Sequence, residues 1–191
     1  MSLIGRLGPF LTRLSLRVYA TWNPADKDAS ITLSGGNLVL TTTTTIAQCR
    51  ATLSKSAGKW YWELLLGTGS GIVGPKLGIA NAGASRSNWT GAETTSWGYF
   101  PNNGGLYNNA TLGGTVATST AGDVIGFALD AGAGTLILYK NGVSLGTVFS
   151  TLTGALYPAS GTAGGTATYT ANFGATPFAY AVPSGFNPGL Y

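Results

Sequence analysis

The chain has 191 residues, which is enough for one domain with its own hydrophobic core. Hydrophobic residues make up 44% of it and charged residues only 8%, a balance that excludes a disordered linker. The formal net charge is +4, but the ten basic residues are spread thinly and form no phosphate-binding cluster, which argues against a nucleic-acid partner.

Residues 1–20 differ from the rest and predict an N-terminal arm. On a helix their apolar and arginine side chains form separate stripes, although Gly5, Gly8 and Pro9 argue against a continuous helix. The segment also fits an extra edge strand or a membrane-surface segment, but we expect an arm that docks on another protein. Its arginines interrupt the apolar run that a secretion signal or a membrane span would need. The expected docking residues are Leu3, Leu7, Phe10, Leu11, Arg13, Leu14, Arg17 and Val18.

Residues 21–191 read as one domain of short strands separated by turns. The chain contains 30 glycines, and Gly, Asn and Ser clusters divide its apolar runs. The sequence Ser34-Gly35-Gly36-Asn37 between two short apolar runs predicts a hairpin. Cys49 is the only cysteine, so an internal disulfide is excluded and a buried packing role is expected.

Alternation of side chains assigns the faces of two further strands. In residues 58–66, Trp60, Trp62, Leu64 and Leu66 point one way, while Tyr61, Glu63 and Leu65 point the other. Near the C-terminus, one face of residues 167–173 carries Ala167, Tyr169, Ala171 and Phe173. Both patterns are typical of strands with one face in a core.

Residues 122–149 give the strongest hairpin signal. Asn141-Gly142 separates two apolar runs, and this pair favours a type I′ turn because both of its central residues need a positive φ. With strands recurring along the chain and no convincing helix after residue 20, the sequence predicts an all-β, two-sheet antiparallel sandwich or a barrel.

Residues 88–109 carry aromatic side chains among asparagines, the pattern that most suggests binding. Trp and Tyr give large contact areas at low entropic cost, and Asn can hydrogen-bond peptide backbone or sugars. Alternatively the aromatic residues fill the core, an interpretation that suits Trp97 better than Trp89 or Tyr107. The candidate binding residues are Trp89, Phe100, Asn102, Asn103, Tyr107, Asn108 and Asn109.

Catalysis is not expected, because the chain has no histidine and therefore no Ser-His-Asp, Cys-His or His-metal arrangement. Asp123 and Asp130 stand where hydrogen-bonding turn residues are expected. Asp26 and Asp28 lie close in sequence, but their surroundings offer too few oxygens for Ca²⁺. We therefore expect no metal site, no cofactor and no enzymatic activity.

Several motifs occur in the order of a known family. They are GKWYWE (58–63), KLGIA (76–80), SWGYF (96–100), LYNN (106–109), GDVIGFALDAGAGTLILYKNGVSLGTVF (122–149), LYPAS (156–160), NFG (172–174) and PFAY with PSGFNP (177–188). Together they resemble the SPRY, or B30.2-like, domain. The resemblance implies a bent two-sheet antiparallel sandwich of the concanavalin-like jelly-roll kind and protein recognition through loops at one end. It also implies a structural role for Glu63 and a place near the peptide-binding surface for Tyr107.

The short, weakly charged loops resemble the SPRY-like modules of bacteriophage structural proteins. We therefore expect a virion surface protein, a capsid decoration, head fibre or tail-associated component that is assembled in the host cytoplasm. Residues 1–20 would anchor it to other virion proteins, a host-surface glycan or protein would be its ligand, and low charge favours homo-oligomers. The alternatives are an intracellular peptide-recognition adaptor and a glycan-binding adhesin for a host receptor.

Overall fold

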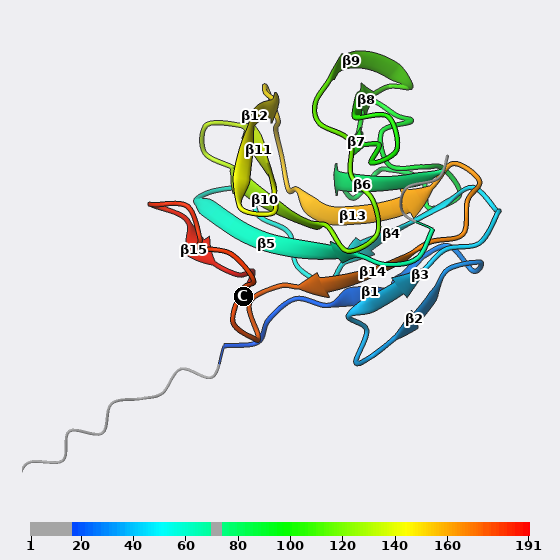
Figure 1. The fold of residues 1–191 in the computed structure, drawn as a ribbon, viewed down its shortest axis with the longest axis horizontal. Helices are drawn as coiled ribbons and strands as arrows, with labels where there is room; N and C mark the ends of the chain where they lie inside the picture. The colour runs from blue at the N-terminus through cyan, green and yellow to red at the C-terminus, as the bar shows by residue number, and fades with distance from the viewer. Residues whose placement is uncertain (1–16, 70–73) are drawn as a thin grey trace, which may run out of the picture.

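The computed structural model describes residues 17–69 and 74–191, and in these two ranges every regular element is a β-strand (Figure 1). Sheet A contains, in spatial order, β1 (Trp22–Lys27), β4 (Ala47–Ala51), β13 (Tyr157–Thr162), β6 (Pro75–Ala80), β7 (Ser96–Tyr99), β8 (Gly105–Asn108) and β9 (Thr111–Thr115). Sheet B contains β12 (Val143–Phe149), β11 (Thr135–Lys140), β10 (Val124–Asp130), β5 (Lys59–Leu66), β14 (Thr168–Asn172), β3 (Val39–Thr41) and β2 (Thr32–Ser34). The short β15 (Asn187–Pro188) pairs with β5 in parallel, and the other strand pairs are antiparallel. The predicted all-β sandwich is confirmed.

Both predicted hairpin turns are confirmed. Asn141 and Gly142 have φ values of 49° and 79°, and Lys140 pairs with Val143 across the turn. These are the left-handed conformations that a type I′ turn requires at both central residues. The turn between β2 and β3 likewise has positive φ at residues 35–37 and pairs Ser34 with Val39.

The core lies between the two sheets and is built by the predicted alternation. Trp62, Leu64 and Leu66 of β5 are at most 1% exposed, and Trp62 stacks on Phe127 of β10 with 5.1 Å between ring centroids. The expected face of residues 167–173 is buried throughout. Each such large apolar side chain contributes about 2 kcal/mol to stability through its removal from water.

On the opposite face of β5, Tyr61 and Glu63 are also buried, because the segment from residue 176 to residue 188 crosses them, whereas Leu65 is 43% exposed. Glu63 is 3% exposed, and its carboxylate accepts hydrogen bonds from the backbone N–H groups of Ala179 (2.8 Å) and Tyr180 (3.1 Å). The Tyr61 hydroxyl donates to the same carboxylate at 3.0 Å. Glu63 therefore has the structural role that the family resemblance implied.

The other residues expected to be structural are placed as predicted. Cys49 is fully buried, and burial raises the pKa of its thiol to about 12, as suits a packing residue. The Asp123 carboxylate accepts a hydrogen bond from Thr120 N at 2.9 Å, and the Asp130 carboxylate accepts one from Ala133 N at 2.9 Å. Both aspartates thus close turns.

Most of the predicted arm lies outside the described residues, including Leu3, Leu7, Phe10, Leu11, Arg13 and Leu14. Arg17 and Val18 are described and exposed, and the Arg17 guanidinium lies 3.9 Å from the centroid of the Tyr191 ring. Ala20 is buried and donates its backbone N–H to Leu190 O at 2.8 Å. The packed sandwich therefore includes Ala20, one residue before the predicted start of the domain.

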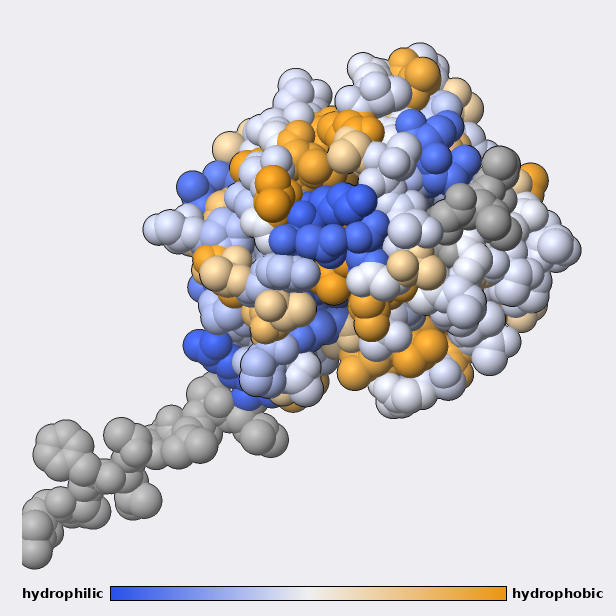
Figure 2. All heavy atoms as spheres, in the orientation of Figure 1, coloured by the Kyte–Doolittle hydropathy of each residue, from blue (hydrophilic) through white to orange (hydrophobic). Residues whose placement is uncertain are grey.

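The surface is mixed in hydropathy. Figure 2 shows one face on which a hydrophilic patch near the middle lies beside hydrophobic patches and residues of intermediate hydropathy. Within the two described ranges, no helix is long and apolar enough to cross a membrane. The same ranges hold no group of three or more Cys, Asp and Glu side chains that could bind a metal ion.

Candidate functional site

The β7–β8 hairpin positions the predicted aromatic residues on two different faces of sheet A. Tyr99 pairs with Leu106, and both side chains are buried in the core. Gly98 pairs with Tyr107, whose side chain therefore points to the outer face. The position of each aromatic residue along its strand thus decides whether its side chain packs in the core or lies on the outer face.

A loop formed by residues 81–95 lies against that outer face and brings Trp89 to it. The loop can approach closely because residue 98 is glycine: a Cβ there would lie 1.9 Å from the carbonyl oxygen of Thr90. Below the loop, the buried Arg50 guanidinium forms a two-point ion pair with Asp26, with contacts of 2.7 and 2.9 Å, and donates to the Ala84 carbonyl. Asp26 is thus paired with arginine.

Trp89, Phe100 and Tyr107, which we name the aromatic cluster, are half-buried and pack on one another. The Phe100 and Tyr107 rings stack with centroids 4.1 Å apart, and Trp89 meets them edge-on at 5.1 and 5.8 Å. Three predicted binding residues from a loop and two strand ends therefore form one partly exposed aromatic surface. Such a surface offers the large, rigid contact area that protein interfaces use.

Lys76 lies directly beneath this cluster, a contact that sequence reasoning missed. Its side chain is 1% exposed, its Nζ lies 3.1 Å from the centroid of the Phe100 ring, and it donates to Pro75 O at 3.3 Å. Burial lowers the pKa of the ammonium group to about 7. The sequence gives no signal for this burial, because Lys76 alternates with the core residues Leu77 and Ile79 and its position therefore predicts an outward-facing, exposed side chain.

Asn102 and Asn103 form the turn beside the cluster. The Asn103 side chain is exposed and its Oδ1 accepts a hydrogen bond from Gly105 N at 2.9 Å. The Oδ1 atom of Asn102 is buried and, among the described residues, has no hydrogen-bond partner. A buried acceptor without a donor costs free energy until a donor reaches it.

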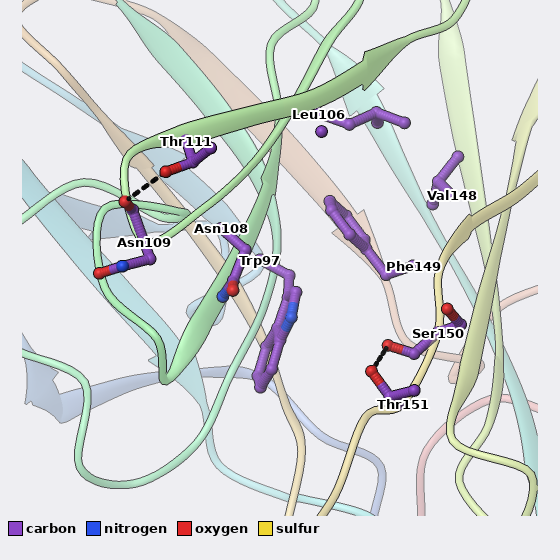
Figure 3. A pocket seen from close by; sticks show the side chains of 10 residues that line it. Trp97, Leu106, Asn108, Asn109, Thr111, Val148, Phe149, Ser150 and Thr151 are labelled. Atoms are coloured by element: carbon purple, nitrogen blue, oxygen red, sulfur yellow. Dashed lines mark hydrogen bonds between the residues drawn. The ribbon is translucent and has the colours of Figure 1, made fainter.

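Asn108 and Asn109 lie elsewhere, in a groove on the core side of the β7–β9 edge. The Asn108 Nδ2 donates to Ser96 O at 2.8 Å and Glu93 O at 3.1 Å, so it fixes the end of the loop, whereas Asn109 is exposed. The groove has a volume of about 490 Å³ (Figure 3). Its lining is Trp97, Leu106, Asn108, Asn109, Thr111, Gly113, Val148, Phe149, Ser150 and Thr151. Of these ten residues, the sequence predicted only Asn108 and Asn109 as binding residues. Residues 148–151 could not be predicted, because only the packing of the two sheets brings the end of β12 to this edge.

Comparison with known proteins gives a family and its relatives. The SPRY-domain family model matches residues 59–176. Ran-binding protein 9 from Xenopus tropicalis is 32% identical over 84% of this chain, and the Homo sapiens protein of that name is 31% identical over 92%. This chain spans only 31% and 25% of the lengths of those two proteins.

Solved structures share the fold. The SPRY domain of human HERC1 superposes with a TM-score of 0.68 and 20% identity, covering 78% of this chain and 96% of that one. The TRIM65 PSpry domain gives a TM-score of 0.65 and 20% identity, covering 81% of this chain and 92% of that one. At these identities the two structures show a common two-sheet architecture.

Proposed function

The chain belongs to the SPRY-domain family, and we propose that it is a protein-recognition module that binds a peptide segment over the aromatic cluster without catalysing a reaction. The observation that carries this proposal is the packing of Trp89, Phe100 and Tyr107 into one half-exposed surface. The exposed Asn103 side chain lies in the turn next to that surface, and its Nδ2 group would donate a hydrogen bond to a peptide carbonyl.

The cluster also suggests what kind of peptide it would bind. Its three side chains are aromatic. The Lys76 ammonium group contacts the cluster from beneath, with its Nζ 3.1 Å from the centroid of the Phe100 ring. The free energy of binding would therefore come from apolar or aromatic anchors in the partner, with backbone hydrogen bonds to the turn. Since two relatives are named Ran-binding protein 9, Ran is one candidate partner to test.

The peptide-recognition adaptor, an alternative from the sequence, thus has better support than the virion surface protein. The curated relatives described above are animal proteins, and they lend no support to a capsid or tail role. The anchoring role of residues 1–20 stays a prediction.

A displayed peptide library and calorimetry test the proposal. The library selects binders of the full chain, and titration of the best peptide then gives its Kd for each variant. We expect Tyr107→Ala and Trp89→Ala each to weaken binding about tenfold or more, because each removes part of a packed aromatic anchor. Phe186→Ala is the matched control, since Phe186 is a half-buried aromatic residue on the sheet B side.

The control should bind like the wild-type chain. Equal Kd values for Tyr107→Ala, Trp89→Ala and wild type, with all three folded by circular dichroism, would remove the aromatic cluster from the binding surface. A library that yields no binder at all would count against peptide recognition itself.

A further inference from the structure

The groove between the β7–β9 edge of sheet A and the end of β12 is separate from the aromatic cluster. Trp97 and Leu106 alternate with Gly98 and Tyr107 along their strands, so the two sites lie on opposite faces of the same hairpin. In Figure 1, β8 and β9 stand opposite β11 and β12, and the groove takes its lining from both sides. A ligand here would leave the proposed peptide surface free.

Among the residues that the structure describes, the lining combines aromatic rings with polar groups and has no charged side chain. Trp97 and Phe149 are both half-buried. Figure 3 shows these two aromatic side chains in the middle of the groove, with Asn109 and Thr111 on one side and Ser150 and Thr151 on the other. The groove therefore offers apolar ring surface flanked on two sides by hydroxyl and amide groups.

The polar groups can accept hydrogen bonds from a ligand. The Thr111 hydroxyl donates to Asn109 O at 3.2 Å and the Thr151 hydroxyl to Ser150 O at 2.6 Å (Figure 3). These bonds use the hydroxyl protons, so the oxygen atoms remain as acceptors. The side-chain amide of Asn109 adds both donors and an acceptor at an exposed position.

One residue of the groove has a strained backbone. Thr151 has a φ of 59°, and a left-handed conformation is unfavourable for a β-branched residue, at a cost of about 1–2 kcal/mol. Asn109 and Ala110 also have positive φ values, of 53° and 55°, but they form the two-residue turn that pairs Asn108 with Thr111. Strain such as that at Thr151 is found where a chain is shaped for a ligand.

From this geometry we propose that the groove binds one unit of a neutral sugar. A pyranose ring has apolar C–H faces and a rim of hydroxyl groups, so one face would lie on the Trp97 and Phe149 rings. Its hydroxyls would bond to Asn109 and Thr111 on one side and to Ser150 and Thr151 on the other. The described lining residues offer no charged side chain to pair with a carboxylate or phosphate, so we expect neutral sugars to be preferred over sialylated, uronic and phosphorylated ones. This inference does not rest on the proposed peptide recognition.

A glycan array of neutral and acidic glycans tests the proposal with the labelled full chain. We expect binding to neutral glycans only, and the methyl pyranoside of the best terminal sugar should then bind with a Kd of about 1 mM in calorimetry. The test variant is Asn109→Gly with Thr151→Gly. Both glycines keep the left-handed backbone, so the variant should fold with an equal or higher Tm.

The double glycine variant should lose sugar binding by about tenfold or more, while Tyr107→Ala should bind the sugar like the wild-type chain. Four results would each overturn the proposal. They are no neutral glycan bound, equal binding by the glycine variant, displacement of the sugar by a peptide that needs Tyr107, and preferred binding of an acidic glycan.

Discussion

Lys76 is the residue whose chemistry departs most from what its sequence position indicates. It is buried at 1% exposure under Phe100, and burial lowers its pKa to about 7. In the unfolded chain a lysine has a pKa of about 10.4. Between these two values the unfolded state binds more protons than the folded state, so this residue makes stability rise with pH.

Substitution of Lys76 by methionine tests that effect. Between pH 7 and pH 9, the free energy of unfolding of the wild-type chain should rise by about 2 kcal/mol relative to Lys76→Met, because the buried charge is lost as pH rises through the folded pKa. Denaturant titrations of both proteins across this range measure the difference. All other ionisable groups are present in both proteins, so their contributions to the difference cancel. A difference that stays constant with pH would show that Lys76 keeps its proton or reaches water.

At the scale of elements, the loop of residues 81–95 and the β7–β8 hairpin together hold the aromatic cluster in place. The close approach of Thr90 O to Gly98 holds Trp89 against Tyr107, and the Arg50 guanidinium, held by Asp26, donates a hydrogen bond to Ala84 O of the loop. The aromatic cluster therefore depends on backbone packing as well as on its three rings.

Gly98→Ala should separate the loop from the hairpin. The new Cβ would lie 1.9 Å from Thr90 O, so we expect a loss of about 1–3 kcal/mol in the free energy of unfolding. Weaker binding of the selected peptide should accompany it. Gly83→Ala is the matched control in the same loop, because nothing lies within 4 Å of its added Cβ and its φ is not positive. Equal stability of the two variants would mean that the loop moves freely away from sheet A.

At the scale of the whole molecule, side-chain alternation and turn residues in the sequence predicted the fold well. Alternation in β5 and the Asn141-Gly142 turn depend on nearest neighbours along the chain, and both are confirmed. The site depends on contacts between distant segments. Sequence reasoning grouped Asn108 with Tyr107, but adjacent residues on a strand face opposite sides, so they belong to different surfaces. Phe149 joins the groove only because the two sheets meet there.

Amide chemical-shift mapping of the labelled full chain with the selected peptide tests the central claim most directly. The account predicts that the largest changes fall on Trp89, Phe100, Asn102 and Tyr107, while the groove residues Ser150 and Thr151 stay unchanged. Changes confined to sheet B, with the aromatic cluster unaffected by saturating peptide, would contradict it.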